Sequence, residues 1–285
     1  MDFPIQDAAS VRPGEVFAGA AARRLRGAFA RLRVSVAAGM RLGDPVAMAL
    51  LAVLGLSAYF LLFPGVDLAV SATFHQAGEG FALAREPILK GLRKSSTWVL
   101  AGLLISAVTI LILRRWSSRP GAIGRIGPGL GRNCAFLLVG LAVGPGLVVN
   151  TVLKNGWGRA RPVQTDLFGG EAAFSGVWRI SDACRDNCSF VSGEASSATW
   201  MVCAVLLMTP ARWRVATVSV ACVYAVALSL NRVAFGGHYL SDVLLSWAIT
   251  ALVLAALHRV MAAAPTPGRR PLPALKRRAS GIAVA

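Results

Sequence analysis

The sequence has few charged residues, and this scarcity excludes an ordinary soluble protein. Only 15% of its 285 residues are charged, whereas 55% are apolar, and the mean hydropathy is +0.61. Soluble domains carry about 25% charged residues. Uncharged, largely apolar runs occur at 46–63, 97–113, 134–153, 195–211, 215–231 and 243–257. The composition therefore indicates a protein that crosses a membrane several times.

Two of these runs need flanking residues to reach the length of a membrane span, which is about 20 residues. The run at 243–257 becomes long enough if its helix begins near Gly237, which draws His238 and Asp242 into the first turns. The fourth run likewise gains by starting around Ser192. We therefore predict an all-α polytopic membrane protein with six transmembrane helices in a bundle.

Acidic residues are scarcer than basic ones, with 13 Asp and Glu against 30 Lys and Arg. Six spans place both termini on one side, together with the second and fourth connecting segments. The segments on that side are 1–45, 114–132, 210–214 and 258–285, and they contain 20 Lys+Arg and 4 acidic residues. The opposite segments, 64–96, 154–194 and 231–242, contain 10 Lys+Arg and 9 acidic residues. Because basic residues favour cytoplasmic loops, we predict that both termini are cytoplasmic. The basic excess then reflects topology and contact with anionic membrane lipids, and it does not indicate a nucleic-acid partner.

The sequence also lacks an internal repeat and a secretory signal, since no short apolar core follows a basic start before residue 46. Residues 1–45 are predicted to be a basic cytoplasmic or interfacial segment. It is either an amphipathic helix on the inner leaflet or a solvated tail. Residues 46–257 form the predicted membrane domain. Residues 258–285, rich in Pro, Arg and Ala, are predicted to be a basic disordered cytoplasmic tail.

The five cysteines divide by their predicted environment. Cys134, Cys203 and Cys222 fall in or beside spans, where cysteine serves as a small apolar packing residue. Cys184 and Cys188 lie together in a predicted outer loop, where an oxidising compartment would allow a disulfide. A free pair is the alternative. Metal binding is a weaker interpretation, because no histidine lies near and only two thiols are available.

Three short stretches on the predicted outer side hold groups that a phosphate ester requires: 154–162, 190–194 and 231–242. Lys154 offers a compact point charge, and Arg161 offers a planar fork of donors to phosphate oxygens. Alternatively, both side chains are interface anchors that reach the lipid head groups.

Ser192 and Gly193 open a predicted helix, whose free N–H groups and dipole attract an anion. The alternative is an ordinary N-cap, with Ser192 capping and Glu194 stabilising the first turn.

Histidine is also scarce, with three in the chain, and His238 stands four residues before Asp242. On a helix this pair shares a face, so the carboxylate could hold one imidazole nitrogen protonated and leave the other as a nucleophile. Arg232, six residues earlier, could contact the same phosphate. A structural His–Asp pair is the alternative. All of these groups fall on one side of a topology derived from other residues, which favours a shared site.

The pattern Lys-x6-Arg-Pro, Ser-Gly and Arg-x5-His-x3-Asp resembles the membrane-bound type-2 phosphatidic acid phosphatase superfamily, over roughly residues 46–257. The resemblance implies that Lys154, Arg161 and Arg232 hold the phosphate, with hydrogen bonds from Ser192 and Gly193. It also implies that His238 attacks phosphorus to form a phosphohistidine and that Asp242 orients the imidazole. No metal or other cofactor is implied.

Three positions depart from the family pattern. Asn231 replaces a serine and Val191 a proline, while Glu194 stands where the family carries a histidine that protonates the leaving oxygen. A glutamic acid can do this only if it holds a proton near the working pH, which the surrounding cations oppose. The alternatives are that Glu194 is the acid, that another residue such as His75 donates the proton, or that the enzyme is weakened.

The expected function is dephosphorylation of a lipid phosphate at the outer face of a bacterial inner membrane. The Ser-Gly-Glu block and the early segment Phe63-Pro64-x2-Asp67-x2-Val70-Ser71-x2-Phe74 resemble bacterial lipid A phosphatases of this superfamily, particularly those acting at the 4′ position. Phosphatidic acid, phosphatidylglycerol phosphate and polyprenyl diphosphate remain open as substrates, as does the oligomeric state. The alternative functions are a lipid phosphotransferase that uses the same histidine and a catalytically silent lipid-phosphate binder.

Overall fold

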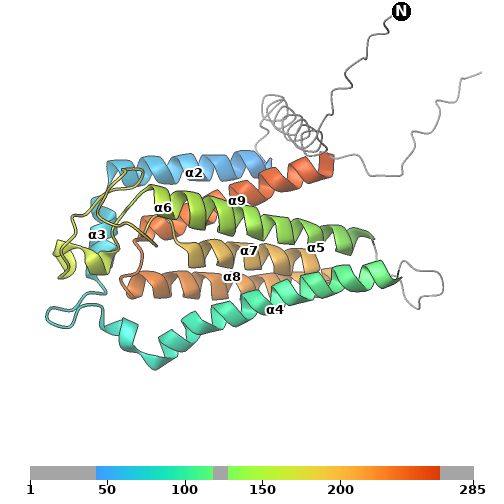
Figure 1. Ribbon diagram of the computed structural model, residues 1–285, viewed down its shortest axis with the longest axis horizontal. Coiled ribbons are helices and arrows are strands. Elements are labelled where there is room, and N and C mark those ends of the chain that lie inside the picture. The colour runs from blue at the N-terminus through green and yellow to red at the C-terminus, as the bar shows by residue number, and fades with distance from the viewer. Residues whose placement is uncertain (1–42, 118–127, 264–285) are drawn as a thin grey trace, which may run out of the picture.

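The computed structural model describes residues 43–117 and 128–263, and its regular structure in these ranges is helical (Figure 1). The described residues form no β-strand, only two isolated bridges. The predicted all-α class is therefore confirmed. The predictions for residues 1–42 and for the tail beyond residue 263 lie outside the described residues.

Six long apolar helices dominate the chain, and one of them is built from three consecutive segments. The main elements are α2 (Pro45–Leu62), α3 (Gly65–Ala72), α4 (Pro87–Ser117), α5 (Pro128–Leu141), η2 (Ala142–Leu153), α6 (Lys154–Gly156), α7 (Gly193–Met208), α8 (Ala211–Ala234) and α9 (Leu240–Ala263). Short 3-10 turns occur at η1 (Ala82–Arg85), η3 (Pro162–Gln164) and η4 (Asp166–Phe168). The sixth helix thus extends to Ala263, beyond the end of its apolar run in the sequence.

The helix formed by α5, η2 and α6 widens into a π-helix over η2, where Pro145 lies inside it. Proline has no N–H to donate, so the regular α-helical ladder cannot continue through this position. The Asn150 side chain donates to the Pro145 carbonyl at 2.8 Å. The helix therefore continues past Pro145 to α6, which carries Lys154.

Within residues 43–117 and 128–263, five helices are long and apolar enough to cross a membrane: α2, α4, the α5–α6 helix, α8 and α9. The remaining apolar helix, α7, has 16 residues. At 1.5 Å per residue it is about 24 Å long, shorter than the roughly 30 Å hydrocarbon core. Pro210 lies directly before α8 and keeps the turn between the two helices short. That α7 is the sixth transmembrane span therefore stays a prediction.

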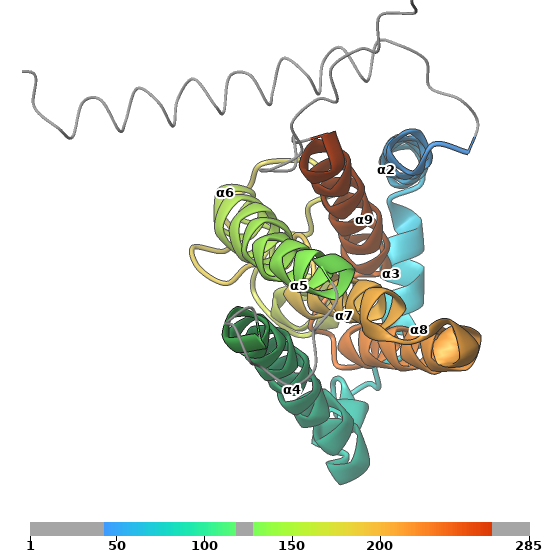
Figure 2. The same cartoon turned by 90° about the vertical axis from the view of Figure 1, so that its right-hand side faces the viewer.

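Helix α7 lies at the centre of the bundle, between the α5–α6 helix, α8 and α9 (Figure 2). The buried Trp200 indole donates to the Leu137 carbonyl at 2.8 Å, and the hydroxyls of Ser196 and Thr250 lie 2.7 Å apart. These contacts fix the depth of α7 relative to its neighbours. Its N-terminus consequently lies beside α6, the end of α8 and the start of α9, next to α3 (Figure 1).

Candidate active site

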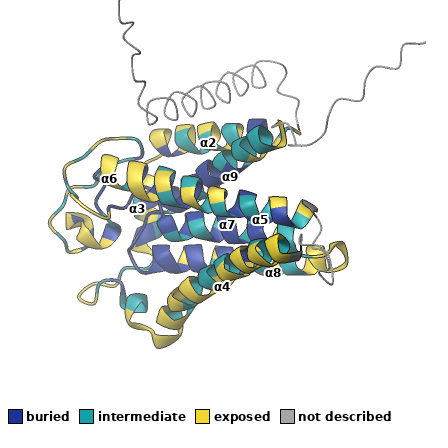
Figure 3. Ribbon diagram, turned by 45° about the vertical axis from the view of Figure 1, so that its right-hand side comes forward, coloured by how far each residue is buried: buried dark blue, intermediate teal, exposed yellow. Residues whose placement is uncertain are grey.

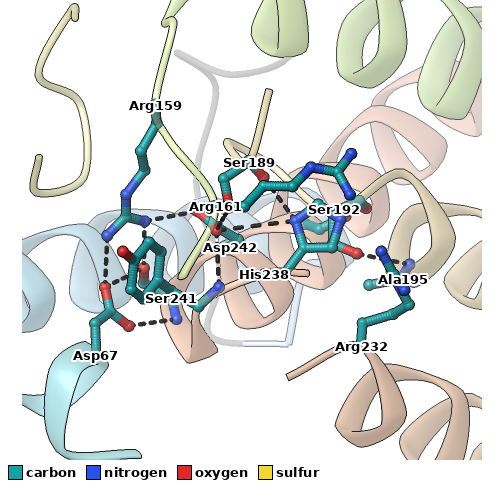
Figure 4. A network of polar contacts seen from close by, with 12 residues as sticks. Asp67, Arg159, Arg161, Ser189, Ser192, Ala195, Arg232, His238, Ser241 and Asp242 are labelled. Carbon is teal, nitrogen blue, oxygen red and sulfur yellow. Dashed lines mark hydrogen bonds and ion pairs between the residues drawn. The ribbon is translucent and has the colours of Figure 1, made fainter. Parts of the chain in front are cut away.

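The predicted site residues gather at this end of the bundle, where residues 157–192 fold over the helix termini (Figure 1). Lys154 lies in α6, Arg232 in the last turn of α8, and Asp242 in the first turn of α9. The three sequence stretches thus come together, as predicted from the topology. Figure 4 shows the polar contacts that join Asp242 to Arg159 and, through Ser189, to His238.

His238 lies in the connection between α8 and α9 and is 2% exposed. Gly236 has φ +63°, which favours glycine, and a side chain at Gly237 would collide with the Arg232 guanidinium. The His238 Nδ1 lies 2.8 Å from the Ser189 carbonyl oxygen. Because a carbonyl can only accept, Nδ1 carries the hydrogen in this contact, and the lone pair of Nε2 is left for chemistry.

Asp242 does not make the direct hydrogen bond to His238 that the four-residue spacing suggests. Its Oδ2 lies 3.9 Å from Nδ1, an ion-pair distance too long for a hydrogen bond. Oδ2 instead accepts from the Ser189 hydroxyl at 2.5 Å and from the Tyr239 backbone N–H at 2.9 Å. Asp242 therefore acts on the imidazole through Ser189, whose carbonyl holds Nδ1.

Arg159 is the principal site residue that the sequence analysis missed. It is fully buried and donates to Asp242 Oδ1 at 2.6 Å and to Asp67 Oδ2 at 2.8 Å (Figure 4). The Ser241 N–H and hydroxyl also donate to Asp67, at 2.9 and 2.6 Å. Burial alone would lower the pKa of Arg159, but the carboxylates of Asp242 and Asp67 outweigh it and raise that pKa. Arg159 thus ties α3 to the helix that follows His238.

Three cations act electrostatically on the imidazole. The pKa of His238 is lowered well below its usual value, first by burial and then by the charges of Arg232, Arg161 and Lys154. These are the three residues that were predicted to hold the phosphate. A neutral imidazole facing clustered cations is suited to attack on a phosphoryl group. Among the described residues, His, Cys, Asp and Glu form no group of three placed to hold a metal ion.

Arg161 is held by the loop that precedes α7. Its Nη2 and Nε donate to the Asn187 carbonyl at 2.8 and 3.3 Å. Asn187 lies inside the loop that a disulfide between Cys184 and Cys188 closes. Of the two alternatives for these cysteines, the structure has the disulfide and not the free pair. Burial, followed by the positive charge of Arg93, lowers the pKa of Arg161.

Ser192 caps α7, and its hydroxyl oxygen accepts from the Ala195 N–H at 3.3 Å. The capping interpretation is therefore correct, although the hydroxyl hydrogen can still be donated to a phosphate. Gly193 follows it in the first turn. A Cβ there would lie 2.5 Å from Asn150 Oδ1 and 3.3 Å from Lys154 Nζ. Glycine thus lets the Lys154 ammonium approach the N-terminus of α7.

Glu194 lies between two arginines. Its Oε1 is 3.0 Å from Arg93 Nε, and its Oε2 is 3.2 Å from Arg232 Nε. Both guanidinium groups pair with this carboxylate. The spare donor considered in the sequence, His75, packs instead in an aromatic cluster, with ring centroids 5.5 Å from Phe81 and 5.4 Å from Phe168. That packing accounts for His75 without a role in proton transfer.

The curated proteins that this chain resembles in sequence are lipid A 4′-phosphatases. A lipid A 4′-phosphatase of Rhizobium leguminosarum is 47% identical over 117 residues, covering 41% of this chain and 50% of that protein. A lipid A 4′-phosphatase of Rhizobium etli is 48% identical over 41% of this chain and 45% of its own length. One from Francisella tularensis subsp. novicida is 42% identical over 38% of this chain and 49% of its own length. The matched part of the chain thus spans about half the length of these curated relatives.

The fold resembles the crystal structure of a transmembrane PAP2 type phosphatidylglycerolphosphate phosphatase from Bacillus subtilis. The match has a TM-score of 0.50 and 20% identity, and it covers 76% of this chain and 94% of that one. At this identity the likeness supports the fold alone.

The family model of the PAP2 superfamily matches residues 135–265. This range contains Lys154, Arg161, Glu194, His238 and Asp242, together with the other predicted site residues. The predicted resemblance is confirmed over this range: residues 135–265 of this chain match the PAP2 superfamily.

Proposed function

We propose that the chain is a membrane phosphatase that hydrolyses a lipid phosphate monoester through a phosphohistidine at His238. The observation that carries this proposal is the contact between His238 Nδ1 and the Ser189 carbonyl, which leaves the Nε2 lone pair free. Nε2 attacks phosphorus, and the bond between phosphorus and the lipid oxygen breaks. Water then attacks the phosphohistidine and gives a proton to the Glu194 carboxylate left by the first step, the N–P bond breaks, and inorganic phosphate leaves.

The phosphate would be held by Lys154, Arg161 and Arg232, with hydrogen bonds from the Ser192 hydroxyl and the Gly193 N–H. The three cations neutralise the charge that is spread over the phosphoryl oxygens in the transition state. Their charges already act on the His238 imidazole before a phosphate enters.

Glu194 is the proposed donor of the leaving-group proton, although its carboxylate is paired with Arg93 and Arg232 in the structure. A phosphate that binds Arg232 competes with Glu194 for that guanidinium. The proton would then pass to the lipid oxygen as the P–O bond breaks.

Lipid A carrying a 4′-phosphate is the favoured substrate, because relatives of that name are 42–48% identical over the region that holds the site. The test compares membrane lipids, by mass spectrometry, from cells with and without the full chain. Loss of one phosphate group from lipid A, but not with His238→Ala, supports the proposal; unchanged lipids contradict it. In detergent, oxygen from labelled water should enter the released phosphate, whereas transfer to a lipid hydroxyl would indicate a phosphotransferase.

The proposed location is the bacterial inner membrane, with α7 as a sixth, short span, both termini cytoplasmic and the site facing the periplasm. The support is the excess of basic residues on the side of the termini. Ala173, in the loop over the site, and Ala211, at the opposite end of the bundle, are both exposed. In a chain without other reactive cysteines, Ala173→Cys should react with an impermeant reagent in spheroplasts, and Ala211→Cys only after lysis. The reverse pattern would place the site in the cytoplasm.

A further inference from the structure

A row of cations on α4 lies beside the active site. Lys90, Arg93 and Lys94 follow the spacing i, i+3, i+4, so they share one face of the helix. All three are exposed, as is much of α4 (Figure 3). Within the described ranges, Lys90 and Lys94 form no ion pair with an acidic residue. Like charges at this spacing repel, and a bound anion would relieve that repulsion.

These cations line a cavity that adjoins the phosphate site. The cavity has a volume of about 380 Å³ and is lined by Lys90, Arg93, Lys94, Ser96, Thr97 and Glu194. A second cavity of about 240 Å³ is also lined by Ser96, Thr97 and Glu194, and it reaches Lys154 and Gly193. The two spaces therefore meet at Glu194, with the predicted phosphate ligands on one side and the α4 cations on the other.

Arg93 lines the α4 cavity and also interacts electrostatically with residues of the phosphate site. Its Nε contacts one oxygen of Glu194 at 3.0 Å, and the other oxygen faces Arg232 at 3.2 Å. The charge of Arg93 also contributes to the lowered pKa of Arg161. The carboxylate of Glu194 thus lies between the α4 cavity and Arg232, one of the groups that would hold the reacting phosphate.

The balance of charge in this cavity favours an anion, since three cations face the single carboxylate of Glu194 and that carboxylate is shared with Arg232. The Thr97 hydroxyl adds a neutral hydrogen-bond donor, whereas the Ser96 hydroxyl donates to the Arg93 carbonyl at 2.7 Å. We infer that Lys90, Arg93 and Lys94 form a second anion-binding subsite, which holds a second anionic group of the lipid while its reacting phosphate faces His238. This inference rests on the proposed function and narrows its substrate class to lipids with two anionic groups in the head.

The test uses two lipids with the same reacting group. Phosphatidic acid carries one phosphomonoester, whereas phosphatidylglycerol phosphate carries a phosphomonoester and an additional phosphodiester. Binding and phosphate release are measured for both lipids with the full chain in zwitterionic micelles. In the double variant Lys90→Gln/Lys94→Gln, the preference for the two-anion lipid, in Kd and in kcat/KM, should fall roughly fivefold to tenfold. The control Arg85→Gln removes a cation of the same segment that pairs with Glu79 away from the cavity, and it should leave the preference unchanged.

Two outcomes overturn the inference: an unchanged preference, or an equal loss for both lipids. The equal loss would show that the lysines attract anionic head groups in general. If wild-type protein released phosphate from neither these lipids nor lipid A, the proposed function would fail. The binding preference would still decide whether the second subsite exists.

Discussion

Two clusters of charged residues lie at the same end of the bundle and differ in how completely their charges are matched. Arg159, Asp67 and Asp242 are at most 1% exposed, and both carboxylates bond to the guanidinium. In the other cluster the side chains of Glu194 and Arg93 are 27% and 50% exposed, and cations outnumber the carboxylate. In the buried cluster, the donors and acceptors are satisfied, and such a cluster can hold other residues in position. A half-exposed cluster with unused donors can instead bind an anion.

His238 lies where the two clusters meet. From the buried side, a chain of hydrogen bonds runs from Arg159 through Asp242 and Ser189 to the imidazole Nδ1 (Figure 4). From the exposed side, the imidazole experiences the charges of the cations that would hold a phosphate. The first cluster therefore sets the direction of the ring, and the second supplies the substrate contacts. The predictions below separate these roles.

The largest effect is expected for His238→Ala, which removes the proposed nucleophile common to both clusters. Turnover should fall below about one hundredth of wild type, because no phosphoenzyme can form. The measurement is phosphate release by purified protein that elutes and melts like wild type. His75→Ala is the matched control and should retain activity, since that ring packs only in the aromatic cluster. Activity of more than a few per cent in His238→Ala would exclude the phosphohistidine mechanism.

The buried cluster is tested by Arg159→Met. Removing one partner of a buried ion pair leaves its carboxylates unpaired, which costs about 3–5 kcal/mol. The free energy of unfolding in detergent should fall by this amount, whereas Arg179→Gln, an exposed change in the same loop, should alter it by less than about 0.5 kcal/mol. Arg159→Lys keeps the charge and should restore part of the loss. A fully stable Arg159→Met protein would show that the cluster does not hold the site together.

The sequence predicted the helical class and the meeting of three distant stretches, because both follow from strong patterns in hydropathy and charge. It did not predict that Arg159 pairs with Asp67, since these residues are separated by 92 positions and neither spacing nor composition relates them. Asp67 was noted in the early segment that resembles lipid A phosphatases, but nothing there indicated Arg159 as its partner. The four-residue spacing of His238 and Asp242 also suggested a direct hydrogen bond. The structure inserts Ser189 between them, because the backbone before α7 folds against α9.

The half-exposed cluster is tested by Glu194→Gln, which keeps the size of the side chain but cannot donate an acidic proton. If Glu194 is the general acid, phosphoenzyme formation on a lipid substrate should slow by about a hundredfold. The defect should shrink for an aryl phosphate, whose departing oxygen needs little protonation. Rapid-quench measurement of the phosphoenzyme gives the rate for both substrates. Equal losses on both would assign Glu194 to holding Arg93 and Arg232 in place.

The smallest effect is a displacement of the pH profile. Burial and then the charges of Arg232, Arg161 and Lys154 lower the pKa of His238, so the imidazole stays neutral below the ordinary histidine value of about 6.5. The stability that this neutral form contributes is fully present above about pH 6.5 and is lost as the pH falls toward the lowered folded-state pKa.

Arg232→Gln removes one of these charges, so the acid limb of kcat/KM should move to higher pH, in addition to any loss of rate. The substrate phosphate titrates near pH 6 in its own right, at about the second pKa of a phosphomonoester. The readout is therefore the difference between variant and wild type on one substrate. Arg179→Gln removes an exposed charge that is not among the causes of the His238 pKa shift, and it should leave the acid limb at the wild-type pH. If Arg232→Gln also left it unmoved, the charge of Arg232 would not act on the nucleophile.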